Sequence, residues 1–157
     1  MKILFVCMGN ICRSPAAENV MRDVANREGL ADAFELDSAG TISYHEGNPP
    51  DPRMRKAAKN RGIEMTGRAR QIRARDLEES DLVLVADRDN LADVERLAAN
   101  VASPCAVRLF CEFCTESENE EVPDPYYGGD DGFETVLDIL EDGCAEIARR
   151  YRSGKLG

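Results

Sequence analysis

The sequence predicts an α/β fold in which a four-stranded parallel sheet carries helices on both faces. Two observations predict this fold. Short apolar segments rich in β-branched residues alternate with helical segments along the chain, and parallel neighbours need right-handed crossovers that place helices against the sheet. The length of 157 residues is typical of one domain, so residues 1–157 are expected to fold as a single unit.

Each element has its own signal in the sequence. Ile3 to Val6 is short and apolar, as in a buried strand. Ser14 is the expected N-cap of the first helix, and Pro15 suits its first turn. The last helix is predicted from apolar residues that follow one face for about five turns, between Phe133 and Tyr151. The other predicted strands are 34–40, 81–86 and 106–110, and the other predicted helices are 51–62 and 89–99.

Composition excludes several classes of protein. With 30 acidic residues against 20 basic ones the net charge is −10, which disfavours nucleic-acid binding. The chain has neither a membrane-length apolar run nor a signal-peptide core, so we expect a cytoplasmic protein without membrane association, whose six cysteines stay reduced. The charge is uneven. Residues 53–75 hold nine basic residues and one acid, whereas residues 109–148 hold 13 acids and no base.

The loop between the first strand and the first helix is the strongest functional signal. Gly9 and Asn10 allow a backbone turn whose N–H groups face an anion, and the helix that follows adds its positive end. Arg13 can bind two phosphoryl oxygens with its planar fork. This positive potential favours the thiolate of Cys7, a nucleophile that needs no neighbouring base. The predicted phosphate-binding residues are Met8, Gly9, Asn10, Ile11, Cys12, Arg13 and Ser14.

Spacing alone does not carry this hypothesis. Cys144 and Arg150 repeat the interval from Cys7 to Arg13, but Cys144 lies on the apolar face of the last helix and is interpreted as structural. His45 is the only histidine, and nothing in the sequence places it near Cys7, so a Cys-His protease mechanism has little support.

A proton donor and the walls of a substrate slot are predicted from three further segments. Asp124 lies between two prolines, which hold its carboxylate on a stiff loop and suit it to general acid and base catalysis. Tyr126 and Tyr127, with Tyr44 opposite, are candidates for the walls of a slot for an aromatic ring. Ser38, at the end of the second strand, is expected to support the loop together with Asn10 and Ser14.

Taken together, the segments 7–14, 37–40 and 124–127 resemble the low-molecular-weight protein tyrosine phosphatases, and the resemblance covers essentially the whole chain. It implies that Cys7 forms a cysteinyl-phosphate and that Arg13 binds the phosphoryl oxygens. It also implies that Asp124 protonates the leaving phenolate and then activates water for the second step. It also implies no metal or cofactor, a phosphotyrosine-containing protein as substrate, inorganic phosphate as product, a monomer or weak dimer, and a redox switch in which Cys12 captures oxidised Cys7. Ile11 favours aromatic phosphomonoesters, since phosphoarginine-specific relatives carry Thr there.

Alternatives stay open at this point. An arsenate reductase on the same fold would use further thiols, for which Cys105, Cys111 and Cys114 are candidates. Cys111 and Cys114 alone make an incomplete zinc site. A phosphopeptide-binding module without turnover is a third hypothesis. The basic segment 53–75 is interpreted as a solvated helix and loop, with steering of acidic phosphoproteins as the alternative.

Overall fold

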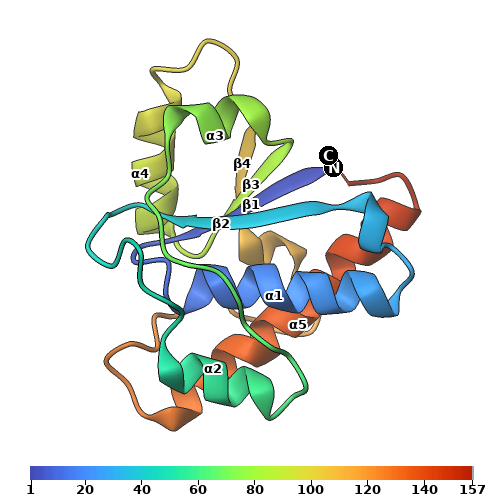
Figure 1. Ribbon diagram of the computed structural model, residues 1–157. Helices are drawn as coiled ribbons and strands as arrows, with labels where there is room; N and C mark the ends of the chain where they lie inside the picture. The colour runs from blue at the N-terminus through green and yellow to red at the C-terminus, as the bar shows by residue number, and fades with distance from the viewer. Residues whose placement is uncertain (157) are drawn as a thin grey trace.

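The computed structural model describes residues 1–156 and contains one parallel sheet with the strand order β2-β1-β3-β4. The predicted fold class is confirmed (Figure 1). The edges of the sheet are β2 and β4, and β1 lies in the interior, paired on one side with β2 and on the other with β3. The strands are β1 (Lys2–Cys7), β2 (Glu35–Gly40), β3 (Leu82–Val85) and β4 (Ala106–Leu109).

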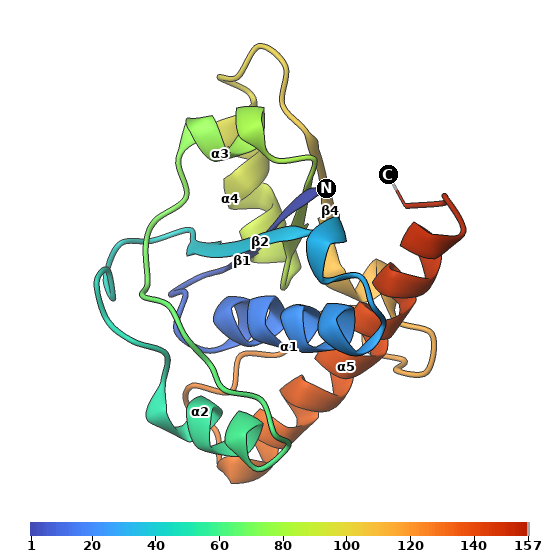
Figure 2. The same ribbon diagram turned by 45° about the vertical axis from the view of Figure 1, so that its right-hand side comes forward.

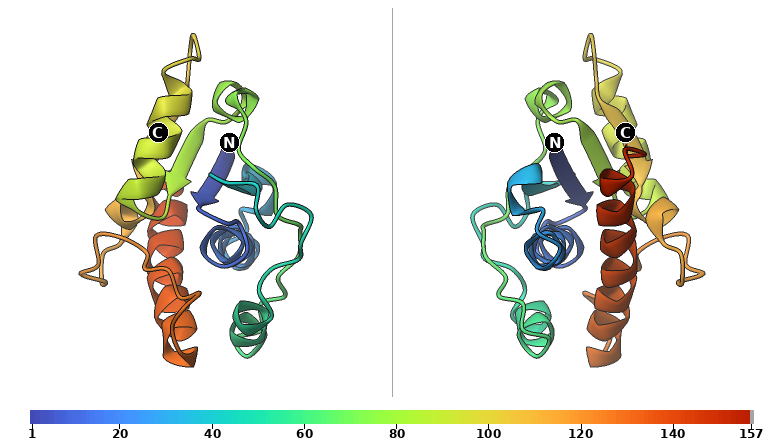
Figure 3. Two further views of the ribbon diagram at one scale, coloured as in Figure 1. Left: turned by 90° about the vertical axis from the view of Figure 1, so that its left-hand side faces the viewer. Right: turned by 90° about the vertical axis from the view of Figure 1, so that its right-hand side faces the viewer.

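Helices cover both faces of the sheet, as the edge-on views of Figure 3 show. Alternate residues of β1 point to opposite faces: Ile3 and Phe5 join the core beneath α1 and α5, whereas Leu4 and Val6 join a smaller core beneath α3 and α4. In Figure 2, α2 lies beside the N-terminal part of α5, away from the sheet. The helices are α1 (Arg13–Arg27), α2 (Pro52–Lys59), α3 (Ala74–Glu79), α4 (Arg88–Ala98) and α5 (Asp130–Arg152), with 3-10 turns at Ala31–Ala33 and Phe110–Phe113.

Three expectations about the elements need correction. Helix α3 was not predicted, because six residues with only Leu77 buried carry too short a pattern. Phe110 begins a 3-10 turn instead of ending β4, and its ring packs against Phe5. Ser14 does not cap α1: Cys12 is the N-cap residue and forms no side-chain capping bond, while the Ser14 hydroxyl turns toward buried partners.

The strand order places the loops after β1, β2 and β3 side by side. The chain runs from β1 to β2 on one side and then crosses to β3 on the other, so the connection changes direction at β1. In open α/β sheets, ligands bind at such a switch point, beyond the carboxyl ends of the strands. Within residues 1–156, no helix is both long and apolar enough to cross a membrane.

Candidate active site

A cavity of about 50 Å³ opens at the carboxyl end of β1, where the strand ends at Cys7 and α1 begins six residues later at Arg13. The lining residues come from the loops after β1 and β2 and from the segment before α5: Cys7, Met8, Gly9, Ile11, Cys12, Arg13, Ile42, His45, Asp124, Tyr126 and Tyr127.

Cys7 lies at the base of this cavity and is only 3% exposed. Its Sγ is 3.0 Å from the Ser14 hydroxyl oxygen, which is within hydrogen-bond distance. Because Ser14 forms this contact, its side chain is not available to cap α1. The positive end of the helix therefore faces the cavity without a protein group to neutralise it.

The backbone of the loop has unused donors. Within residues 1–156, no hydrogen bond is donated by the N–H groups of residues 8–12, which lie between the end of β1 and the start of α1. Buried backbone donors without partners are rare in folded proteins. Met8, Gly9, Ile11 and Cys12 line a cavity that also holds an arginine, and free N–H groups in such a place are the donor set that an oxyanion requires.

Asn10 holds the loop in this conformation. Its φ of 58° is left-handed, and it is the one non-glycine residue with positive φ among the described residues. Its amide nitrogen donates to the hydroxyls of Ser14 at 2.8 Å and Ser38 at 3.0 Å, and its Oδ1 accepts from the Arg70 N–H at 3.0 Å. Gly40 lies directly beneath, where a Cβ would come within 2.6 Å of the Met8 carbonyl oxygen. The three predicted support residues thus meet in one network, which Arg70 extends.

Arg13 is fixed from its outer side. Its Nη1 donates to Asp87 Oδ2 at 2.7 Å and to the Val122 carbonyl at 3.0 Å, and its Nη2 is 3.7 Å from Asp124 Oδ2. Burial lowers the pKa of Arg13, but negative charge at Cys7 and the bond to Asp87 outweigh it, so that the pKa is raised. The guanidinium is therefore a permanent, oriented cation at the cavity wall.

Asp124 brings a carboxylate to the cavity beside Arg13. Its Oδ1 accepts from the Tyr126 N–H at 3.0 Å, and its side chain is about one third exposed, at 35%. Tyr126 and Tyr127 line the cavity as the walls of the predicted slot. Tyr127 does so with a largely exposed ring. Tyr44 does not line the cavity: it packs edge-on against His45, which lines the cavity in its place.

Three residues of the site were missed. Asp87 follows β3, and an acid just beyond a buried strand next to β1 was a usable signal. His45 and Ile42 lie in the loop after β2. A Cβ on Gly9 would come within 3.0 Å of the His45 ring, which shows how closely this loop approaches the phosphate-binding loop. No local signal points to that contact, because it depends on how the two loops fold over the sheet.

The other five cysteines differ in their surroundings and in their position relative to the cavity. Burial raises the pKa of Cys12, and the negative charges of Asp51 and Cys7 raise it further, so Cys12 stays protonated beside Cys7. Cys144 is fully buried in the main core. Neither Cys111 nor Cys114 lines the cavity, and the Cys114 thiol donates to the Ile139 carbonyl oxygen at 3.7 Å. Cys105 is also absent from the lining. Among residues 1–156, no group of three or more His, Cys, Asp or Glu side chains is placed to hold a metal ion.

Comparison with known proteins gives consistent matches over nearly the whole chain. A family model described as low molecular weight phosphotyrosine protein phosphatase matches residues 2–155. A protein of Synechocystis sp., named as a low molecular weight protein-tyrosine-phosphatase, is 48% identical over 149 residues, 94% of each chain.

Solved structures show the same likeness. The protein tyrosine phosphatase of Entamoeba histolytica, crystallised with Hepes in the active site, superimposes with a TM-score of 0.92 at 42% identity over 99% of both chains. The arginine phosphatase YwlE, as a cysteine-to-serine mutant with a phosphorylated active-site serine, gives a TM-score of 0.85 at 27% identity over 97% of this chain and 96% of its own.

Proposed function

The chain belongs to the low molecular weight phosphotyrosine protein phosphatase family, and from that premise we propose that it hydrolyses phosphotyrosine in proteins through a phosphoenzyme on Cys7. Asp124 acts as acid and then as base, and no metal takes part. The observation that carries the proposal is that residues 8–12 donate no backbone hydrogen bond within residues 1–156, while four of them and Arg13 line the same cavity as Cys7. They supply the positive charge that a metal supplies in other phosphoryl-transfer enzymes.

In the first step the Cys7 thiolate attacks phosphorus, an S–P bond forms and the bond from phosphorus to the phenolic oxygen breaks. Charge on the equatorial oxygens is bound by the loop N–H groups and by Arg13, whose orientation Asp87 maintains. Asp124, in its protonated form, donates its proton to the leaving phenolate oxygen. The Ser14 hydroxyl, 3.0 Å from Sγ, stabilises the thiolate before attack.

In the second step Asp124 is a carboxylate and removes a proton from a water molecule. The water oxygen attacks phosphorus, the S–P bond breaks, and inorganic phosphate leaves as the thiolate returns. A covalent intermediate of this kind is supported by the related arginine phosphatase that carries phosphate on its active-site serine. Because that relative is named an arginine phosphatase, phosphoarginine is a substrate to test here as well. Ile11 and the rings of Tyr126 and Tyr127, which line this cavity, favour an aryl group.

The test compares variants on aryl phosphates whose phenols differ in acidity. Cys7→Ser is expected to abolish turnover. Asp124→Ala should slow the esters with the least acidic phenols most, because those leaving groups depend most on a proton. Asp131→Ala is the matched control, since Asp131 is an exposed acid of the same region that does not line the cavity. Equal slowing of all esters by Asp124→Ala would contradict its role as the acid.

The same preparation separates the competing functions. Phosphotyrosine, phosphoserine, phosphoarginine and arsenate are offered in parallel, the last with a coupled reductase assay. We expect phosphate release from phosphotyrosine, and trapping of the phosphoryl group on Cys7 in the Asp124→Ala variant after rapid acid quench. Arsenate turnover that requires Cys111 or Cys114 would overturn the proposal, as would binding of phosphotyrosine without any phosphate release.

A further inference from the structure

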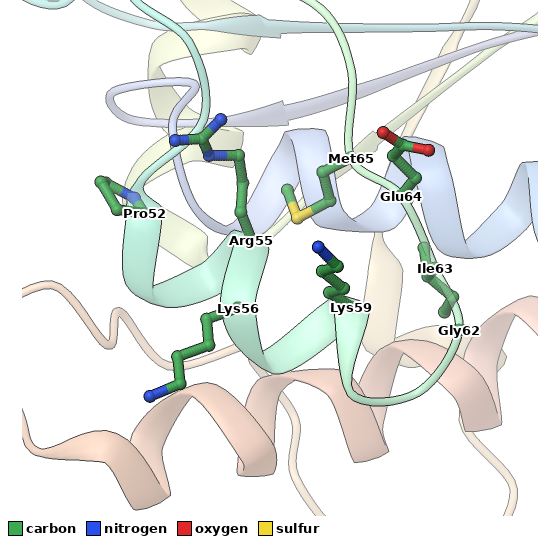
Figure 4. Close-up of a pocket in the computed structure, with 8 residues that line it drawn as sticks. All are labelled: Pro52, Arg55, Lys56, Lys59, Gly62, Ile63, Glu64 and Met65. Carbon is green, nitrogen blue, oxygen red and sulfur yellow. The ribbon is translucent and has the colours of Figure 1, made fainter.

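A second cavity, of about 570 Å³, lies between α2 and the segment that follows it. We call it the basic hollow; its lining is Pro52, Arg55, Lys56, Lys59, Gly62, Ile63, Glu64 and Met65. Figure 4 shows Arg55 and Lys59 rising from α2 beside the segment that carries Glu64 and Met65, while Lys56 points toward α5. None of these residues takes part in the phosphatase mechanism.

The charge of the basic hollow is not neutralised by the protein. Arg55, Lys56 and Lys59 are exposed and form no ion pair with any residue of 1–156, while Glu64 contributes one negative charge, which leaves a net charge of +2. Other arginines of the same basic segment are paired: Arg61, for example, contacts three acids of α5. In a chain with 30 acids and 20 bases, the unpaired Arg55 and Lys59 beside the cavity, with Lys56 on the side of α2 that faces α5, mark a surface that attracts anions.

The shape of the basic hollow favours a polypeptide over a small anion. Its floor includes Ile63 and Met65, which are 5% and 7% exposed, and its cations are the solvated ends of long side chains spaced along a helix. A compact anion would contact few of them at once. An acidic segment of a protein can place several carboxylates against the cations and aliphatic groups against the floor.

Helix α2 also connects the basic hollow with the active site. The N–H of Asp51, the N-cap of α2, donates to the carbonyl oxygen of Ile11 in the phosphate-binding loop at 2.8 Å. Arg53, in the first turn, donates to the carbonyl oxygen of Tyr126 at 3.0 Å. One wall of the substrate slot is therefore bonded to the helix that carries Arg55, Lys56 and Lys59, so a chain that leaves the slot over Tyr126 meets α2 next.

We propose that the basic hollow binds acidic side chains near the phosphotyrosine of a protein substrate, and thereby selects phosphoproteins with acidic sequences around the phosphorylated residue. This inference rests on the proposed phosphotyrosine phosphatase activity. From the sequence alone, residues 53–75 are interpreted as a solvated helix and loop. For Arg55, Lys56 and Lys59, which lack acidic partners, this binding role replaces that interpretation.

The experiment uses two phosphotyrosine peptides of equal length, one with glutamates and one with glutamines at the flanking positions, and p-nitrophenyl phosphate as a substrate with no flanks. The test variant is Arg55→Gln/Lys56→Gln/Lys59→Gln. The control Arg27→Gln/Arg96→Gln/Lys155→Gln removes the same charge from exposed positions elsewhere. Glu64→Gln adds a change of opposite sign, because it removes the negative charge of the hollow.

For the test variant we expect KM for the glutamate peptide to rise about tenfold at low salt, with kcat and the kinetics on p-nitrophenyl phosphate unchanged. The control should keep the wild-type KM, and Glu64→Gln should lower it. An equal rise for both peptides would overturn the proposal, and so would a change in sedimentation coefficient showing that the hollow joins two copies of the chain.

Failure of the proposed activity gives a different result, because the wild-type protein would then release no phosphate from any of the three substrates. Binding of the fluorescent peptides to the wild-type protein, followed by anisotropy, decides the question in that case. Tighter binding of the glutamate peptide that the test variant loses would support the basic hollow. Equal binding of both peptides would refute it.

Discussion

Replacement of Asn10 tests whether the conformation of the phosphate-binding loop is enforced by one side chain. Asn10 is 3% exposed, its φ is 58°, and its amide forms three hydrogen bonds, to Ser14, Ser38 and the Arg70 N–H. At about 1 kcal/mol net for each bond, their loss costs about 3 kcal/mol. A left-handed conformation costs an alanine about 1 kcal/mol more. Asn10→Ala is therefore expected to lower the free energy of unfolding by about 4 kcal/mol.

Asn10→Gly separates the two contributions. Glycine adopts the left-handed conformation without the Cβ penalty, so this variant should lose only the hydrogen bonds, about 3 kcal/mol, and remain about 1 kcal/mol more stable than Asn10→Ala. In both variants Ser14 loses its donor while it still faces Cys7, and we expect kcat to fall by about tenfold, equivalent to about 1.4 kcal/mol of transition-state stabilisation.

The free energies come from urea unfolding with linear extrapolation, and kcat comes from p-nitrophenyl phosphate turnover. Asn60→Ala is the matched control, because Asn60 is exposed in an ordinary right-handed conformation at the end of α2. A loss below about 1 kcal/mol for Asn10→Ala would refute the reasoning, given the three bonds at stake. Equal stability of the alanine and glycine variants would refute the part that concerns backbone conformation.

Three further predictions concern other contacts of the site and the fold. Asp87→Ala should lower kcat/KM for p-nitrophenyl phosphate by about 100-fold, because Arg13 loses the partner that orients it; an unchanged value would contradict this. Cys12→Ser should keep its phosphatase turnover, but that activity should not recover after peroxide treatment followed by reductant, because no thiol is left to trap oxidised Cys7 in a disulfide. In the wild type, formation of the Cys7–Cys12 disulfide, measured by intact mass, should become faster as the pH rises, because the pKa of Cys12 is raised. Glu146→Gln should destabilise the protein at pH 7. Hydrogen bonds from two arginines lower the pKa of Glu146 to about 2, so the difference in urea midpoint should disappear as the pH falls from about 4.3 through that value. A difference that is as large at pH 2 as at pH 7 would contradict the assignment.

Much of the fold was predictable because its signals are local. The run from Ile3 to Val6 has the pattern of a buried strand, and α5 repeats its apolar residues at helical spacing over many turns. Helix α3 and the 3-10 turn at Phe110 were not predictable in the same way. Each is too short to show a period, and each depends on contacts with distant residues, such as the packing of Phe110 against Phe5.

The candidate site divides along the same line. Cys7, Asn10 and Arg13 lie in one short segment between a strand and a helix, so their proximity follows from the chain itself. Ser14 was placed correctly in that segment and among the residues that support the loop, but its expected role as the N-cap of α1 was wrong. The same sequence is compatible with a Ser14 hydroxyl that caps α1 and with one that is buried and bonds to Cys7. Only the packing of the loop decides between the two.

The sequence by itself determined the loop that holds Cys7 and, apart from α3 and the 3-10 turns, the order of strands and helices, because hydrogen-bonded turns and hydrophobic periodicity act between near neighbours. Only the tertiary structure decided which distant groups complete the site: Asp87 behind Arg13, Arg70 behind Asn10 and His45 in the position expected for Tyr44. The physical reason is that these contacts join residues 60 to 74 positions apart, or loops at the ends of different strands. They form when the strands align at β1 and bring their carboxyl ends together, and no short-range pattern in the chain encodes that alignment.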